Sequence, residues 1–396
     1  MYNRGTEGDQ VTAGRGATSA NPDRAPPLYA GAVTEDFADQ DRVFSDAFAV
    51  LEQAIADHAF PGASIAVTLS GKLIALKAFG RFTYEVNAPT VTTETIFDIA
   101  SITKVAATTT MAMILHERGV LDLEAPIVGV LPEFARDDAR RRSVTFRSLL
   151  AHSSGLPAYE KLFLRAHARE SLLAEAFKVP LKYPPGTHAE YSDIGFILLG
   201  VALARLAGEP LDRFCRRDIF DPLGMVHTGF KPSGELRRQI PPTADDKTLR
   251  KRIIQGEVYD ENASVLGGIA PHAGLFSSAR DLAIFADAML SDGKPVIQPE
   301  TVALFTKREV SPPGTSRALG WDTPSSPSQS GKYFSPASFG HLGYTGTSLW
   351  IDLVRQLSIT LLTHRTWPDC SNLAIKQVRP RFHDAVVEAM ERAGKH

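Results

Sequence analysis

A serine and a lysine three residues apart, Ser101 and Lys104, are the side chains best suited to nucleophilic chemistry. Residues at this spacing share one face of a helix, so the amine can take the hydroxyl proton without a histidine or a metal. Helix-forming residues continue to Gly119, which predicts that Ser101 stands at a helix N-terminus. There the dipole favours an oxyanion and disfavours protonation of Lys104. The alternative is a capping serine with a surface lysine one turn later.

The same spacing occurs a second time, at Ser291 and Lys294. A pattern this short arises by chance about once or twice in a chain of this length. Gly293 and Pro295 predict a turn here, in which the serine and the lysine would not share a helical face. We therefore interpret this second match as a solvated loop.

A loop rich in proline and glycine delivers Tyr191 and Asp193 just ahead of an apolar helix predicted over 195–207. The ordinary pKa of a phenol, about 10, is close to that of lysine. A tyrosine beside Lys104 could therefore share its proton and act as base and acid in successive steps. The alternative is a serine or aspartate cap with a tyrosine packed beside it.

A glycine-rich stretch over 340–348 leads into a predicted strand and contains His341, Gly343 and Tyr344. Glycine lets a backbone N–H approach an acyl oxygen closely. His341 could hold a carboxylate or orient the site, although a structural histidine at the entry to a strand is the simpler alternative. The sequence patterns of other serine nucleophiles, zinc proteases and nucleotide-binding loops do not occur.

The composition predicts a large globular protein. With 396 residues, 43% of them hydrophobic, and a net charge of −2, the chain can form one large domain or two closely packed ones. No apolar run approaches the roughly 20 residues of a membrane span, and no basic stripe indicates nucleic-acid binding. Cys215 and Cys370 are far apart, which predicts neither a disulfide framework nor a zinc site. We expect no metal and no other cofactor.

Residues 1–40 are rich in small residues and proline and lack the apolar core of a secretory signal. We predict that they form a disordered extension. The sequence as written thus indicates a cytoplasmic protein, and a periplasmic one if the start site is misassigned.

Predicted strands lie near both ends of the chain and predicted helices lie between and around them. The strands cover 63–69, 72–79, 348–353 and 357–363, with a two-residue turn at Ser70-Gly71. The helices cover 44–58, 161–177, 195–207 and 383–392. This order predicts an α+β fold, in which an antiparallel sheet built from N- and C-terminal strands is flanked by helices and carries an inserted, mostly helical lobe.

Residues 41–396 are accordingly predicted to form one domain. Its α/β lobe comprises 41–100 and about 270–396, and its helical lobe about 101–269. The site should lie at the seam between them. We predict a long surface loop over 311–339, which could rim the site.

Three stretches in this order, Ser101-Ile102-Thr103-Lys104, Tyr191-Ser192-Asp193 and His341-Leu342-Gly343, resemble the motifs of the serine β-lactamase and penicillin-binding-protein-like superfamily. The chain is most similar to class C-type β-lactamase-related hydrolases, which include family VIII esterases, D-aminopeptidases and D-alanyl-D-alanine carboxypeptidases. Further similar segments lie at 152–157, 220–225 and 274–282. The resemblance extends from about residue 44 to the C-terminal helix.

The resemblance implies that Ser101 is the acylated nucleophile and that Lys104 activates it. It also implies that Tyr191 is the general base and acid that assists deacylation. Such an enzyme needs no cofactor.

The resemblance further implies a substrate-binding role for Asp193, where the family often has asparagine, and for His341, Gly343 and Tyr344. The backbone N–H groups of Tyr344 and the nucleophile would form the oxyanion hole. His341 replaces a permanent cation, and Leu342 removes a hydroxyl usually found in the third motif. Both changes weaken the grip on a carboxylate, so efficient β-lactamase activity is not expected.

We therefore expect a serine hydrolase that forms an acyl-enzyme on Ser101 and hydrolyses small carboxylic esters or peptidoglycan-related amides. One alternative is a D-alanyl-D-alanine carboxypeptidase, a muropeptide amidase or a weak β-lactamase. Another is a catalytically slow protein that binds a cell-wall fragment. The expected partner is a small-molecule ester, amide or muropeptide, without nucleic acid or a membrane span, and the sequence makes no prediction of the oligomeric state.

Overall fold

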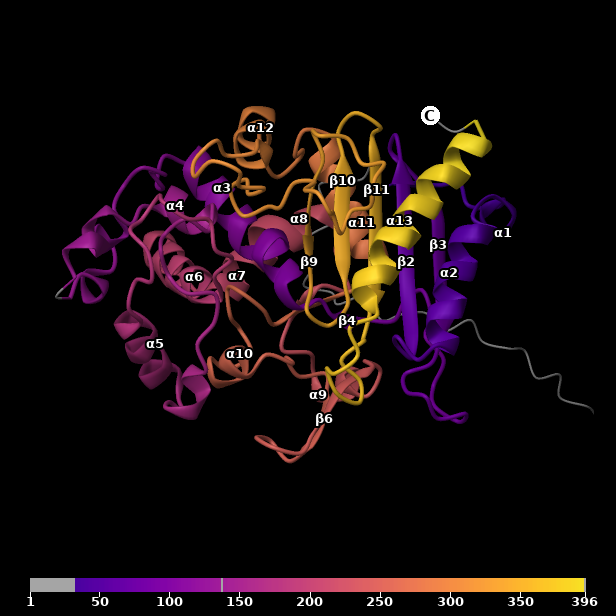
Figure 1. The fold of residues 1–396 in the computed structure, drawn as a ribbon, viewed down its shortest axis with the longest axis horizontal. Helices are drawn as coiled ribbons and strands as arrows, with labels where there is room; N and C mark the ends of the chain where they lie inside the picture. The colour runs from indigo at the N-terminus through magenta and orange to yellow at the C-terminus, as the bar shows by residue number, and fades with distance from the viewer. Residues whose placement is uncertain (1–32, 137, 395–396) are drawn as a thin grey trace, which may run out of the picture.

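A six-stranded sheet forms the centre of the protein, in the order β1-β3-β2-β11-β10-β9 (Figure 1). The computed structural model describes residues 33–136 and 138–394. The N-terminal part of the chain supplies β1 (Thr34–Glu35), β2 (Gly62–Leu69) and β3 (Lys72–Gly80), and the C-terminal part supplies β9 (Phe339–Leu342), β10 (Ser348–Asp352) and β11 (Leu357–Thr363). Antiparallel pairing of β2 with β11 joins the two groups. The predicted fold is confirmed, except that β1 pairs with β3 in parallel.

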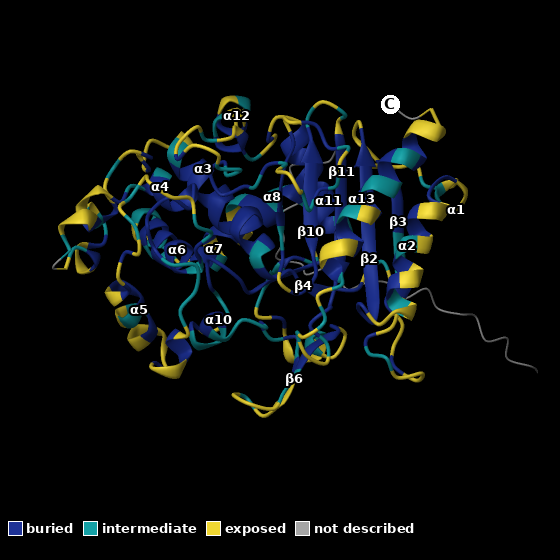
Figure 2. Ribbon diagram, viewed as in Figure 1, coloured by how far each residue is buried: buried dark blue, intermediate teal, exposed yellow. Residues whose placement is uncertain are grey.

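Local sequence explains the β2–β3 hairpin. Ser70 and Gly71, between the two strands, both have positive φ (48° and 77°), as a tight hairpin turn requires. Side chains of β2 alternate between two buried faces, with Ile65 and Val67 in one core cluster and Ala66 in the other. The strand is buried along its whole length because both faces of the sheet are covered (Figure 2).

Helices cover both faces of the sheet. On one face α2 (Ser45–Ala56) packs against α13 (Ile375–Arg392), and α11 (Ala279–Leu290) covers the other. The C-terminal helix is longer than the predicted 383–392 and contains Pro380. Burial of Ile375, Val378 and Phe382 in the core beneath it outweighs the backbone hydrogen bond that a proline cannot donate.

The middle of the chain is mostly helical and lies beside the sheet (Figure 1). Its regular helices are α3 (Thr110–Glu117), α4 (Phe146–Leu150), α5 (Arg169–Lys178), α6 (Asp193–Ala207), α7 (Leu211–Cys215), α8 (Asp221–Leu223), α9 (Gly234–Arg237) and α10 (Glu261–Val265). Outside this region lie α1 (Gln40–Val43) and α12 (Pro299–Thr306). The region also contains strands that the sequence did not predict, β5 (Gly229–Phe230), β6 (Pro242–Asp246) and β7 (Arg252–Gln255).

Two small sheets hold these strands. β5 pairs with β8 (Leu275–Ser277), which also pairs with β4 (Phe97–Asp98), and β6 pairs with β7. Within the described residues no single helix is long and apolar enough to cross a membrane, and only α6 joined to Leu211–Leu223 across a 72° bend would qualify as a pair.

The single helix predicted over 161–177 is wrong. A short 3-10 turn, Leu162–Leu164, comes first, and α5 begins only at Arg169. Asn262 accepts a hydrogen bond from the Phe163 N–H (3.0 Å) and donates one to the Glu160 carbonyl (2.8 Å). These long-range bonds replace helical ones, so tertiary contacts override the local preference.

Two further predictions also need correction. Residues 1–32 of the predicted extension lie outside the described residues, whereas Thr34–Glu35 already pairs with the sheet, so the domain starts before residue 41. Residues 311–338 contain no regular helix or strand. They are not simply a surface loop, however, because Leu319 and Trp321 are fully buried.

Candidate active site

The structure brings Ser101, Lys104 and Tyr191 together. Lys104 Nζ lies 3.0 Å from Ser101 Oγ, and the Tyr191 hydroxyl lies 2.8 Å from the same oxygen. Two of these residues are 90 positions apart in sequence, so only the fold can create this contact. Ser101 Oγ accepts a hydrogen bond from each neighbour, a geometry that suits a nucleophile flanked by two proton carriers.

A sharp turn between β4 and the helix presents Ser101. Ala100, directly before it, has φ of 48°, which costs an L-residue about 1–2 kcal/mol. The Asp98 carboxylate stabilises this turn by accepting the Ala100 N–H at 2.8 Å. The predicted helix then follows as a 3-10 turn (Ala100–Ile102), a π-helical stretch (Lys104–Thr109) and α3.

His152 positions the loop that carries Tyr191. Its Nδ1 accepts the Ser192 N–H at 3.0 Å, and its ring packs 4.7 Å from the Tyr191 ring. Burial, followed by the charges of Arg317 and Lys104, holds the pKa of His152 well below its usual value. A neutral imidazole is therefore available as the acceptor that fixes this loop.

Lys104 is completely buried and in contact with three oxygen atoms. Besides Ser101 Oγ, Nζ donates to the His272 carbonyl (2.8 Å) and forms an ion pair with Asp193 Oδ1 (2.7 Å). Burial alone lowers the pKa of Lys104, but Asp193 and then Tyr191 outweigh it and raise this pKa above its ordinary value. Any push of the helix dipole against protonation is therefore outweighed, because a carboxylate in direct contact dominates.

Tyr191 is protonated at rest as well. Burial and the nearby Asp193 carboxylate raise its pKa to about 12, although Lys104 and Ser101 lower it in part. Both candidate bases therefore hold their protons at neutral pH. Removal of the Ser101 proton by either group would therefore use the small fraction of molecules in which that group is deprotonated.

This electrostatic arrangement predicts a pH profile. A general base works in its deprotonated form, so we expect kcat/KM for a neutral ester to rise from pH 6 to at least pH 9. Asp193→Asn removes the carboxylate that raises the pKa of both Lys104 and Tyr191. The ascending limb should then move to lower pH in steady-state measurements across this range.

Glu190→Gln is the matched control for this shift, since it removes one carboxylate that pairs instead with Lys182 (2.9 Å). The ascending limb of kcat/KM for this control should coincide with that of the wild type. An ascending limb of Asp193→Asn at the wild-type pH would contradict this electrostatic effect of Asp193 on Lys104 and Tyr191.

Ser101 opens into a cavity of about 480 Å³. The residues that line it are Ser101, Tyr191, Arg317, Asp322, His341, Leu342, Gly343, Tyr344, Arg365, Leu373, Ile375, Lys376 and Arg379. Of the predicted substrate-binding residues, His341, Gly343 and Tyr344 thus border the cavity. Asp193 does not line it and contacts Lys104 instead.

His341 faces the cavity as a neutral imidazole. Its Nδ1 donates to the Leu342 carbonyl (2.8 Å), which leaves Nε2 as a buried acceptor without a partner among the described residues. Burial, then the charges of Lys104 and Arg317, lower the pKa of His341 to about 3. The third motif thus carries no cation at neutral pH.

Two threonines hold the turn before Ser101 against the segment after β9. Thr345 Oγ1 donates to the Asp98 carbonyl (2.7 Å) and Thr347 Oγ1 to the Ile99 carbonyl (3.1 Å). Gly343 permits this approach, because a Cβ there would lie 2.5 Å from the Ile99 oxygen. Within residues 33–136 and 138–394, the N–H groups of Ser101 and Tyr344 donate to no other protein group, so both are available to an oxyanion.

The sequence did not predict the cationic side chains that line the cavity or the residues that position Ser101. Arg317 comes from the 311–339 segment, which does rim the cavity, while Arg365 and Arg379 flank the turn after β9. No motif marks a single arginine in an irregular segment. Among the described residues, no group of three or more His, Cys, Asp or Glu side chains could hold a metal ion.

Comparison with known proteins gives consistent matches. The family model described as Beta-lactamase matches residues 47–376. An N-acetylmuramyl-L-alanine amidase of Bacillus subtilis (strain 168) is 33% identical over 343 residues, with 77% of each chain covered. A putative D-alanyl-D-alanine carboxypeptidase of Escherichia coli (strain K12) is 33% identical over 305 residues, covering 69% of this chain and 70% of the relative.

Solved structures share the fold. EstCE1, a hydrolase with promiscuous acyltransferase activity, has a TM-score of 0.72 at 21% identity and covers 88% of this chain and 100% of its own. A penicillin-binding protein homologue from Caulobacter crescentus has a TM-score of 0.70 at 19% identity, covering 88% of this chain and 97% of its own.

Proposed function

Because the chain belongs to the Beta-lactamase family and is a serine hydrolase, we propose that it cleaves amide or ester bonds of small peptidoglycan-derived acids through an acyl-enzyme on Ser101. The observation that carries this proposal is the contact of Ser101 Oγ with Lys104 Nζ and the Tyr191 hydroxyl at the edge of an open cavity. A protein that only captures cell-wall fragments has no need of this arrangement.

In the acylation step Ser101 Oγ attacks the carbonyl carbon while its proton passes to Lys104 or Tyr191, whichever is deprotonated. The N–H groups of Ser101 and Tyr344 stabilise the oxyanion. Tyr191 then protonates the departing amine or alkoxide as the carbon–nitrogen or carbon–oxygen bond breaks. In the second step water attacks the carbonyl carbon of the acyl group on Ser101. Lys104 or Tyr191 takes a proton from this water, and Ser101 Oγ receives a proton as its bond to the acyl group breaks.

The side chain of Arg317 favours a substrate that carries a carboxylate, because the guanidinium groups of Arg365 and Arg379 are bonded to main-chain carbonyls. Arg365 is committed to the carbonyls of Tyr344 (2.7 Å), Cys370 (3.1 Å) and Asn372 (3.3 Å), and Arg379 to those of Gly343 (2.7 Å) and Thr347 (3.0 Å).

The Arg317 guanidinium, by contrast, lies 5.4 Å from the Tyr191 ring and 3.6 Å from Asp322, an ion pair longer than a hydrogen bond. Together with Lys376, which also lines the cavity, it can replace the cation that His341 lacks and bind a substrate carboxylate.

The test pairs two p-nitrophenyl esters, the neutral acetate and the succinate monoester with a free carboxylate. Arg317→Gln should lower kcat/KM for the succinate ester by about tenfold to a hundredfold, the value of a charged hydrogen bond, with little change for the acetate. Arg308→Gln, in a neighbouring segment and outside the cavity lining, is the control. Equal losses on both esters would contradict the role of Arg317, and no turnover of either ester by the wild type would contradict a hydrolytic function.

The relatives' names suggest two natural linkages, which mass spectrometry of products can separate. The amidase linkage is represented by N-acetylmuramyl-L-alanine and the carboxypeptidase linkage by a peptide ending in D-alanyl-D-alanine. Release of free alanine from only one of them assigns the activity.

A further inference from the structure

His272 contacts Lys104 through its main chain, and its side chain takes no part in the reaction described above. The His272 carbonyl accepts Lys104 Nζ at 2.8 Å. The preceding carbonyl, of Pro271, accepts Thr108 Oγ1 at 2.7 Å, one helical turn after Lys104. Residues 271–272 therefore run along the helix that carries the lysine.

The side chain of His272 is tied to a carboxylate. It is buried, and its Nε2 lies 2.9 Å from Asp260 Oδ1. Asp260 is the N-cap of α10, where the same oxygen accepts the Ala263 N–H at 2.7 Å. Burial raises the pKa of Asp260, but His272 and this N–H outweigh it and hold the pKa below its ordinary value. The acceptor is thus a carboxylate at neutral pH.

The residue before Asp260 reaches the other side of the nucleophile. The Tyr259 N–H donates to Asp98 Oδ2 at 2.7 Å, and Asp98 Oδ1 accepts the Ala100 N–H next to Ser101. Two adjacent residues therefore hold the two sides of the site. Tyr259 braces the turn before Ser101, and Asp260 braces His272, whose carbonyl holds Lys104.

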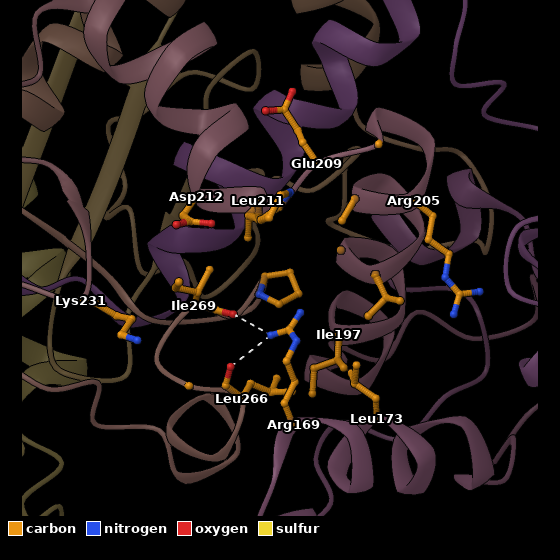
Figure 3. A pocket seen from close by; sticks show the side chains of 17 residues that line it. Arg169, Leu173, Ile197, Arg205, Glu209, Leu211, Asp212, Lys231, Leu266 and Ile269 are labelled. Carbon is orange, nitrogen blue, oxygen red and sulfur yellow. Dashed lines mark hydrogen bonds between the residues drawn. The ribbon is translucent and has the colours of Figure 1, made fainter. Parts of the chain in front are cut away.

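The segment between α10 and His272 is anchored from a second direction. It forms one wall of a cavity of about 660 Å³ that shares no lining residue with the Ser101 cavity (Figure 3). There Arg169 donates to the carbonyls of Leu266 (3.1 Å) and Ile269 (3.4 Å). Pro271 packs directly on α6 because residue 200 is glycine, where a Cβ would lie 2.2 Å from the proline ring.

We propose that Asp260 and His272 are positioning residues for Lys104, and that their contact fixes the main-chain carbonyl that aims Nζ at Ser101. The ammonium of Lys104 has three N–H groups for three acceptors, namely Ser101 Oγ, Asp193 and the His272 carbonyl. When Lys104 loses a proton, the fixed carbonyl keeps one N–H, so the free lone pair can turn to the serine hydroxyl. Without the Asp260 contact the carbonyl can move and the lone pair loses its alignment.

This inference rests on the proposed acyl-enzyme, and its test therefore begins with covalent labelling of Ser101 by a fluorophosphonate. A wild-type protein that does not label contradicts the proposed function, whereas equal labelling of the variants contradicts only the inference. His272→Gln and Asp260→Asn should each lower the labelling rate about tenfold to a hundredfold, as expected for a misplaced base. His383→Gln, at a buried histidine bonded to Ser348, is the control and should label at the wild-type rate.

Two measurements separate positioning from a general loss of structure. The double variant should label no more slowly than the slower single variant, since both changes break one link; losses that multiply would contradict the proposal. A weakened carbonyl acceptor also disfavours the ammonium form of Lys104, so the ascending limb of kcat/KM should move to lower pH.

The charged and titratable groups that raise the pKa of Lys104 are Asp193 and Tyr191. The charge of Lys104 in turn lowers the pKa values of His152, His341 and Asp260 around it. If His272→Gln labels at the wild-type rate and the ascending limb of its kcat/KM profile stays at the wild-type pH, the proposed role of His272 is overturned. If His272→Gln fails to fold, Asp260→Asn, whose side chain is partly exposed, carries the same test.

Discussion

Replacement of Ser101 by alanine is expected to lower kcat for ester hydrolysis by about ten-thousand-fold or more, because it removes the oxygen that both Lys104 and Tyr191 contact. Loss of a nucleophile in a coupled group removes nearly all the catalysis of that group. Initial rates with p-nitrophenyl acetate measure the loss of turnover, and covalent labelling by a fluorophosphonate measures the loss of the reactive serine.

The chain provides a matched control for this substitution. Ser291 stands in the second serine–lysine pattern, but it follows the end of α11 in an exposed turn with Asp292 and Gly293 at positive φ (60° and 81°). Ser291→Ala should label and turn over as the wild type does. If Ser101→Ala also labels at the wild-type rate, the nucleophile lies elsewhere.

Tyr191→Phe is expected to lower kcat by about a hundredfold to ten-thousand-fold and to leave KM nearly unchanged. The substitution removes only the hydroxyl that bonds Ser101 Oγ at 2.8 Å. The remaining ring can still pack against His152 and lie beside Lys104, whose Nζ is 4.8 Å from its centre. Steady-state kinetics separate the two constants, and single-turnover experiments show whether acylation or deacylation slows.

Tyr333→Phe is the control for this change. Tyr333 donates to Glu388 (2.8 Å) on α13 and does not line the cavity, so its loss should leave kcat unaltered. A wild-type kcat for Tyr191→Phe would reject the role of this phenol in proton transfer.

Features that depend on residues close together in the sequence were predictable from the sequence alone. The Ser70-Gly71 turn, the four strands expected at the two ends and the apolar α6 all follow from local patterns. The contact of Ser101 with Lys104 follows from helical spacing, and its contact with Tyr191 was expected once the order of the motifs was recognised.

The electrostatics of the site were not predictable, because they depend on burial and on contacts between distant segments. The ion pair of Asp193 with Lys104 reverses the effect expected of the helix dipole. Arg317 enters the cavity from a segment without regular structure, and Asp260 reaches Lys104 only through His272. No spacing rule in one sequence connects such residues.

The pairing of β2 with β11 has a consequence for the order of events during synthesis. The turn before Ser101 leaves the ribosome well before Thr345 and Thr347, which clamp it from 247 and 248 residues further along the chain, and before the β11 strand that pairs with β2. Contacts of such high sequence separation form late in folding. A nascent chain therefore carries Ser101 in an unassembled site, and we expect hydrolytic capacity to arise only once β9, β10 and β11 are available to close the sheet.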